Sequence, residues 1–442
     1  MAIDHWMMFG TFAEQKYFVY PSPETYRPGG TIITANMAAY APAGLADFLL
    51  ESAGGRLNYI IDPLTHAFQH RPNSVTDSED KPKKSIYGLA QAYSDLCTKL
   101  VGKRPLLPRH FENESELRTL TKNCLNFQTT QLSQAMANTD VVKYVTTNAN
   151  DLRPYAVIAP YFYMTETTYG DWLPINRRAI EIAAEYVNNA RLFAEIVISQ
   201  GVILNETISR EILDTLKMDA VQGFILWVDN LDEQEGGTTR LRGFLEFARA
   251  LRDGGKEVIN LHGGYFSVLA AGKLGGGALS GVCHGPEFGE VRSVVPVGGG
   301  IPIARYYFPQ LHARVRYRDT LRYVRGNDWL KSAAIFHTNV CNCDVCIETL
   351  AGDPANFVKF GIGNVKEVRR GDTFARIEYP TSETKQRCLK HYLQRKGIEY
   401  KFADTASEAQ IRADLELGRD ALVDVTGLDG VSHLNAWLNV LS

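Results

Sequence analysis

The sequence predicts an α/β fold, a (β/α)8 barrel of the TIM type followed by a C-terminal zinc-binding subdomain. Short apolar runs alternate with segments of helical periodicity, polar residues follow many of those runs, and three cysteines lie within six positions late in the chain. With 442 residues, of which 45% are hydrophobic, the chain can form one large core or two modest ones.

Eight short runs rich in β-branched, aromatic and other apolar residues are predicted to be strands. Segments between them carry apolar residues three and four positions apart, as helices packed on a core do. Such alternation predicts a parallel sheet, and eight candidates indicate a closed barrel. The predicted strands are Thr31–Asn36, Leu57–Ile61, Tyr155–Tyr161, Ala194–Ser199, Gly223–Val228, Glu257–Leu261, Ala278–Cys283 and Ala333–His337. The predicted helices are Ile86–Leu100, Glu114–Ala137, Pro174–Ala194, Ser209–Met218 and Thr239–Arg252.

Two domains are expected. Residues 1–335 should form the barrel with an N-terminal extension, and residues 336–442 should form the zinc-binding and basic subdomain. The composition changes after Cys346, because residues 366–401 carry many lysines and arginines against fewer acidic residues. This region is predicted to present a positively charged face.

Composition and charge exclude several classes of protein. Lys and Arg number 47 against 50 Asp and Glu, so the formal net charge is −3 and a general basic coat for nucleic acid is excluded. Any nucleic-acid partner must therefore be held by a local basic patch. The apolar runs are shorter than the roughly 20 residues that a membrane span needs, and Met1–Tyr20 does not resemble a leader peptide. We expect a cytoplasmic protein with no membrane partner.

The strongest local signal is a group of three thiols. Cys341, Cys343 and Cys346 are close enough in sequence to share one tetrahedral Zn²⁺ ion. A closed structural site needs a fourth ligand, and Cys388 and His391 lie three residues apart on one face of a predicted helix. We expect His391 to complete a structural Zn²⁺ site, with Cys388 as the alternative. Reduced or redox-active thiols are the other interpretation.

Polar residues follow several of the predicted strands. In a (β/α)8 barrel the carboxyl ends of the strands share one face, where active sites are built. Polar residues also follow strands where there is no functional site. Several such residues at strand ends are therefore a stronger indication of a site than any one of them. The residues concerned are Asp62, Gln200, Asp229, Asp232, His262, Gly263, Gly264 and His284.

The cysteine pattern followed by a helical histidine resembles the zinc motif of the tRNA-guanine transglycosylase superfamily. Asp62, which ends the run Ile-Ile-Asp, resembles the general-base aspartate of that family, and Ser199-Gln200-Gly201 resembles its base-reading turn. The spacing from Cys346 to His391 is longer than is usual there, which implies an insertion around Ala351–Tyr379.

The sequence departs from the family pattern at two places. Both departures resemble the pattern of the family's divergent DNA-modifying branch. The family's Asp-Ser-Gly-Gly loop is replaced by Asp62-Pro63-Leu64-Thr65-His66, and its late-strand nucleophilic aspartate has no counterpart in Gly281–His284. The resemblance therefore implies a DNA-guanine transglycosylase that exchanges guanine for a 7-deazaguanine such as 7-cyano-7-deazaguanine. Its partners would be DNA, the free 7-deazaguanine base and a separate ATPase or helicase.

Base exchange with retained configuration at C1′ needs a carboxylate nucleophile and a group that moves protons on the purine. We expect Asp229 to be the nucleophile, forming an aspartyl-glycosyl intermediate, and Asp62 to be the general acid/base. A turn at Asp62 and a helix cap at Asp229 are the structural alternatives.

Recognition of the base and of the nucleic acid is assigned to further residues. Gln200 can read the edge of guanine, the backbone of Gly263 and Gly264 can approach a base closely, and Tyr161 can stack on it. A run of arginines is expected to bind phosphates, although such runs are often only a solvated face. These are Arg314, Arg316, Arg318, Arg322 and Arg325.

Two other functions remain open from the sequence. A tRNA-guanine transglycosylase would keep the same barrel and zinc site and act on tRNA. A barrel without catalytic activity would serve as a zinc-stabilised scaffold that binds nucleic acid.

Overall fold

The computed structural model describes residues 3–10, 18, 28–52, 57–137, 153–286, 289–296, 303–370 and 373–442, and it confirms the predicted α/β fold class. The chain divides into two compact units. The first comprises Met1–Val19, Pro28–Asp232 and Thr239–Pro296, and the second comprises Tyr20–Arg27, Glu233–Thr238 and Val297–Ser442.

Eight parallel strands form the barrel of the first unit. In the sheet each strand pairs with its neighbours in the order β3-β2-β1-β8-β7-β6-β5-β4. The ring closes between β3 and β4 through the parallel bridge Ile60–Ala156 and the bond from the Tyr155 N–H to the Tyr59 carbonyl at 2.7 Å. The strands are β1 Asp4–Phe9, β2 Gly30–Thr34, β3 Asn58–Asp62, β4 Val157–Ile158, β5 Leu192–Ile198, β6 Gly223–Val228, β7 Glu257–Asn260 and β8 Gly281–His284.

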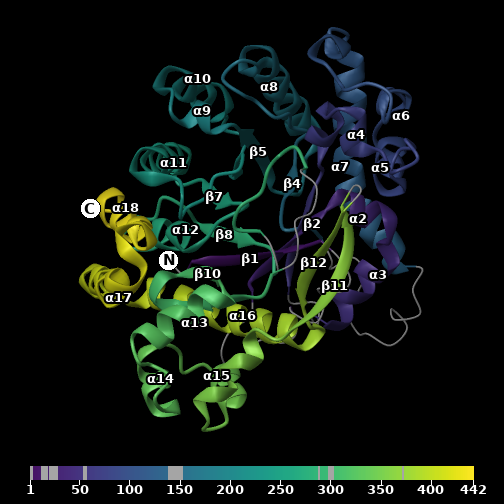
Figure 1. Ribbon diagram of the computed structural model, residues 1–442. Coiled ribbons are helices and arrows are strands. Elements are labelled where there is room, and N and C mark those ends of the chain that lie inside the picture. Colours follow the sequence, from purple (N-terminus) through teal and green to yellow (C-terminus); the bar gives the residue numbers. More distant parts are fainter. Residues whose placement is uncertain are drawn as a thin grey trace. The chain divides into compact units, whose positions relative to one another are not determined.

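Helices cover the outside of the barrel strands (Figure 1). The predicted helix Ile86–Leu100 is two helices, because Ser94 interrupts it and its hydroxyl caps the second one by accepting from the Cys97 N–H at 3.1 Å. The helices are α2 Ala35–Tyr40, α3 Pro42–Asp47, α4 Pro72–Val75, α5 Lys84–Tyr93, α6 Asp95–Leu100, α7 Glu114–Ala137, α8 Tyr169–Tyr186, α9 Gln200–Ile203, α10 Glu206–Leu216, α11 Gly237–Arg252 and α12 Tyr265–Ala271.

One strand prediction is wrong, and one strand of the barrel was not predicted. Ala333–His337 is not a strand but part of helix α14 (Ala333–Asn339), whose first turn is capped by the Ser332 hydroxyl. The strand that replaces it in the barrel is β1, which the sequence reading missed. Its residues Asp4, His5, Met7 and Met8 include no β-branched side chain, so the usual strand signal is weak there.

The second unit contains two antiparallel strand pairs and a group of helices. One pair is β9 (Arg305–Phe308) with β10 (Ala313–Arg316), and the other is β11 (Gly363–Arg370) with β12 (Thr373–Pro380). The helices are α13 Tyr317–Gly326, α14, α15 Asp344–Leu350, α16 Ser382–Thr405, α17 Glu408–Gly430 and α18 Ser432–Val440.

The second unit begins earlier than the expected boundary at residue 336. Strand β9 and helix α13 belong to it because β9 packs against α16, and α13 packs against α17. Tyr306, Tyr307 and Phe308 of β9 are fully buried. In the part of the chain that the structure describes, no helix is long and apolar enough to cross a membrane.

A buried ionic network joins β9 to α16 in the second unit. The Glu399 carboxylate accepts a hydrogen bond from the Tyr307 hydroxyl at 2.6 Å and another from His312 Nδ1 at 2.7 Å. Lys396, itself buried, lies 3.5 Å from the same carboxylate. Burial alone would raise the pKa of Glu399, but Lys396 and His312 lower that pKa to about 2.

We predict that Glu399→Gln lowers the free energy of unfolding by about 3 kcal/mol, because buried cations lose their partner charge. Chemical denaturation at pH 7 measures this. The pKa of Glu399 is lower in the folded state than in the unfolded state. Its charge therefore stabilises the fold above about pH 4.5, and this stabilisation is lost as the pH falls toward 2. The difference between wild type and variant should shrink over that range. Asp404→Asn, a half-buried position near the end of the same helix, serves as the control and should change stability little.

Candidate active site and metal centre

Four buried side chains of the second unit form a cluster that can hold a metal ion. The ligand atoms of Cys341, Cys343, Cys346 and His391 all lie within 4.8 Å of one another. Cys343 caps the start of α15 and Cys346 lies in its first turn, while His391 projects from α16. The expected fourth ligand, His391, is therefore in place. Cys388 lies outside the cluster, where its thiol donates to the Phe360 carbonyl at 3.4 Å.

The surroundings of His391 fit metal binding. Its Nδ1 lies 3.2 Å from Cys343 Sγ and 3.5 Å from Cys346 Sγ, while Nε2 donates to the carbonyl oxygen of Tyr307 at 2.7 Å. That bond keeps the proton on Nε2 and leaves the Nδ1 lone pair facing the thiols, as a ligating histidine requires. The ring of Tyr306 stacks on the imidazole at 4.2 Å. An ion held by all four side chains would have no open position for water, as in structural sites.

Asp62 lies at the carboxyl end of β3 and is only 1% exposed. Its Oδ1 accepts hydrogen bonds from the Leu64 N–H at 2.9 Å and the Tyr161 hydroxyl at 2.6 Å. Its Oδ2 is buried without a hydrogen-bond partner among the described residues. Burial raises the pKa of Asp62 to about 6, although the bonds from Tyr161 and Leu64 oppose the rise.

A second carboxyl group lies in the barrel interior, and the sequence reading missed it. Glu195 of β5 stands between Phe193 and Val197, which both face the core, and it is 3% exposed. Its carboxyl oxygens are buried, and the nearby Tyr161 hydroxyl favours their ionised form. Burial and then the neighbouring Asp62 raise the pKa of Glu195 well above its usual value. At neutral pH the pair therefore retains a proton.

Asp229 follows β6 on the same face of the barrel and is half-buried. Its Oδ2 accepts from the Tyr163 hydroxyl at 3.0 Å and its Oδ1 from the Val294 N–H at 2.7 Å. Two donors on separate oxygens fix the orientation of the carboxylate and stabilise its negative charge.

One segment after β4 connects the two aspartates. Tyr161 bonds to Asp62 and Tyr163 bonds to Asp229, and these tyrosines are two residues apart in the chain. His66 Nδ1 lies 3.0 Å from the Tyr161 hydroxyl. Because that hydroxyl donates to Asp62, it accepts from His66, whose pKa burial lowers so that the ring is neutral at pH 7.

Side chains, together with bonds from Ala159 and Met164 to β5, hold the backbone of this segment. The N–H and C=O of Ile158 both bond to the Gln128 amide, at 2.8 Å each. The same two groups of Tyr161 bond to the Thr65 hydroxyl, those of Phe162 to the Asn176 amide, and those of Tyr163 to the Gln69 amide. Because buried backbone groups must be paired, these four side chains fix the positions of both tyrosines.

The expected base-recognition residues have other contacts in this structure. The Gln200 amide donates to the backbone carbonyls of Asp229, at 3.1 Å, and Asn230, at 2.8 Å, so it supports the turn after β6. Tyr161 is 2% exposed and its ring packs on His66, so neither of its faces is open. Gly263 donates its N–H to Cys283, and a Cβ there would meet Val282 at 2.4 Å, which explains this glycine by packing. Gly264 caps α12.

Aromatic rings and histidines line the same end of the barrel. Trp227 of β6 contacts His66 edge-on at 5.2 Å and His262 at 4.8 Å between ring centroids. Burial lowers the pKa of His262 to about 3, and its Nδ1–H donates to the Gly289 carbonyl at 3.0 Å. His66 was not singled out by sequence, although it lies four residues after Asp62 in the same loop.

The five arginines lie on β10 and along α13. Arg314 is half-buried, with its guanidinium over the Tyr392 ring at 4.9 Å, whereas Arg316 is exposed. The other three, Arg318, Arg322 and Arg325, are exposed and share one helix face by their spacing of four and three. Arg318 pairs with Glu378 at 2.7 Å, and Arg322 lies 3.8 Å from Asp319.

Neither the scan against models of protein families nor the search of curated proteins finds a relative of this chain. The assignment of function therefore depends on the arrangement of the side chains.

We predict that the purified protein carries about one equivalent of bound metal and that Cys343→Ser and His391→Ala lose it, together with thermal stability, because metal binding contributes to folding. Elemental analysis and thermal melting measure the two effects. Cys388→Ser is the matched control and should retain the metal. Loss of metal in that variant alone would contradict the ligand set.

We predict that Glu195→Gln reduces the pH dependence of stability. A carboxyl group whose pKa is raised by folding stabilises the fold in its protonated form. This stabilisation is complete below about pH 4 and is lost as the pH rises through about 6 and beyond. Between pH 5 and 8 the wild type should therefore lose roughly 1–3 kcal/mol more unfolding free energy than the variant. Urea unfolding at both pH values measures this, with the exposed Glu246→Gln as control. Equal pH dependence in wild type and Glu195→Gln would show that Glu195 does not hold the proton.

Proposed function

We propose that this chain is a base-exchanging transglycosylase that replaces guanine in DNA with a 7-deazaguanine base such as 7-cyano-7-deazaguanine. The observation that carries the proposal is the pair Asp62 and Asp229, which follow two strands on one barrel face and bond to tyrosines two residues apart. Retaining displacement at an anomeric carbon needs two such carboxyl groups with different roles.

Asp229 is proposed as the nucleophile. Its carboxylate is oriented by Tyr163 and Val294 and is more accessible than that of Asp62. Attack on C1′ forms the Asp229 oxygen–C1′ bond and breaks the bond from C1′ to guanine N9. The departing base takes a proton and leaves as neutral guanine. The entering base then loses its N9 proton, attacks C1′ and releases Asp229, so the configuration is retained.

Asp62 is proposed to transfer these protons. A carboxyl group with a pKa of about 6 can both donate and accept a proton near neutral pH. It would protonate the leaving guanine and take up the N9 proton of the entering base. Glu195, which retains its proton behind Asp62, would add no second negative charge when Asp62 is ionised between the two half-reactions.

The metal centre is proposed to hold structural zinc. Three thiolates and one imidazole are soft and borderline donors, which favour Zn²⁺ among the common divalent ions. The residues around it hold the ligands in position, as the bond from His391 to Tyr307 does. The arginine face of α13 is proposed to bind DNA phosphates. The affinity for DNA should therefore fall as the salt concentration rises.

We predict that Asp229→Asn reduces exchange of labelled guanine in DNA by at least about a thousandfold, because the variant lacks the nucleophilic oxygen charge. Incorporation of labelled base into duplex and single-stranded DNA measures the exchange, and fluorescence anisotropy measures DNA binding, which should persist. Asp219→Asn, an exposed position before β6, is the control.

Three outcomes of this assay would change the assignment. Exchange into tRNA but not DNA would make tRNA the substrate. DNA binding without exchange in the wild type would indicate an inactive barrel. Full activity in Asp229→Asn would remove Asp229 from the chemistry. Mass spectrometry of nucleosides from DNA and tRNA of cells with and without the protein gives an independent answer.

A further inference from the structure

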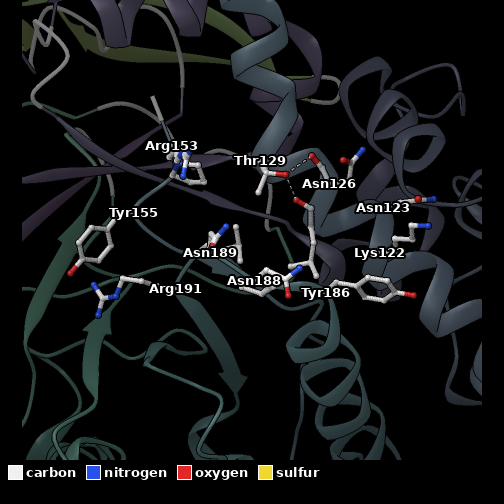
Figure 2. Close-up of a pocket in the computed structure, with 15 residues that line it drawn as sticks. Lys122, Asn123, Asn126, Thr129, Arg153, Tyr155, Tyr186, Asn188, Asn189 and Arg191 are labelled. Atoms are coloured by element: carbon white, nitrogen blue, oxygen red, sulfur yellow. Dashed lines mark hydrogen bonds between the residues drawn. The ribbon is translucent and has the colours of Figure 1, made fainter. Parts of the chain in front are cut away.

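A groove with a volume of about 650 Å³ opens on the barrel unit away from the two aspartates. Helix α7, the residues before β4 and the loop from α8 to β5 line it (Figure 2). Residues that precede β4 and β5 lie at the amino ends of the strands, whereas Asp62 and Asp229 follow the carboxyl ends of theirs. Since all eight strands are parallel, the groove and the aspartates lie at opposite ends of the barrel.

The described lining of this groove is basic. It includes Lys122, Arg153 and Arg191 and no carboxylate, in a chain whose formal net charge is −3. Arg191 is paired within the structure, because its Nη2 lies 2.7 Å from Glu257 and its guanidinium covers the Tyr155 ring at 4.5 Å. Lys122 and Arg153 are exposed on the groove and give it a positive potential that favours an anion.

Amide groups and an accessible ring complete the lining. Asn188 and Asn189 lie, in the view of Figure 2, between Tyr155 with Arg191 on one side and Tyr186 with Lys122 on the other. The Tyr186 ring is 39% exposed, and Lys122 Nζ lies 6.0 Å from its centroid. Asparagine amides offer both a donor and an acceptor, which suits the polar edge of a nucleobase, and an exposed ring suits its face.

We propose that this groove is a second ligand site, which binds a mononucleotide. The phosphate would lie near Arg153, and the base would lie against the amides of Asn188 and Asn189 and against Tyr186, beside which Lys122 lies. The volume falls within the usual range for small-ligand sites. This site does not depend on the proposed base exchange, because it shares no residue with the face that carries Asp62 and Asp229.

Titration calorimetry with adenosine monophosphate tests the proposal, since the proposed exchange site selects guanine and not adenine. We expect saturable binding of one equivalent with a Kd of about 1 mM or tighter. Arg153→Gln should weaken binding about tenfold, as expected for a lost bond to a phosphate, and Lys122→Gln should weaken binding through the loss of positive potential in the groove. Arg242→Gln, an exposed basic position on α11, is the matched control and should bind as the wild type does. Asp229→Asn should also bind normally.

Several results would overturn the site. These are the absence of binding at millimolar concentration, unchanged affinity in both groove variants, and equal affinity for adenosine without its phosphate. Binding of a single-stranded oligonucleotide but not of the mononucleotide would identify a nucleic-acid surface instead. Lys122 and Arg153 are exposed, so circular dichroism melting of the variants should match the wild type and separate lost binding from lost folding.

Discussion

The geometry of the candidate site depends on how the backbone after β4 satisfies its hydrogen bonds. β4 pairs with β5 over only two residues, and its other neighbour, β3, contributes a single bridge. The amide of Gln128, the hydroxyl of Thr65 and the amides of Asn176 and Gln69 then supply what a longer strand ladder would have supplied. An unpaired buried backbone group costs about 1–3 kcal/mol, so this segment has few alternative conformations.

The barrel interior imposes a second constraint, which is the cost of burying charge. Asp62 and Glu195 share an apolar surrounding with Trp227 and Phe193, where two negative charges would be strongly disfavoured. Retention of a proton by Glu195 avoids that cost and leaves Asp62 as the group that can gain and lose a proton near neutral pH. The same two carboxyl groups therefore affect both the stability of the barrel and the proposed chemistry. Active sites commonly lower the stability of a fold in this way.

Much of the arrangement could be predicted from the sequence, for identifiable reasons. The apolar runs of β5 and β6 and the thiols at 341, 343 and 346 are local signals, and they gave the barrel and the metal cluster. β1 and α14 were missed because β1 lacks β-branched residues and because a cap at Ser332 outweighs the apolar run after it. Glu195 was missed, since only its place in an inward-facing alternation indicates that it is buried.

The side chains that hold the tyrosine segment come from different elements, and this has a consequence for motion. Thr65 and Gln69 belong to the loop that follows Asp62, whereas Gln128 and Asn176 belong to α7 and α8. A displacement of that loop would carry Tyr161 and Tyr163 with it, and through them it would reposition both aspartates at once. A rearrangement of that loop would therefore alter the hydrogen bonds of both carboxyl groups together.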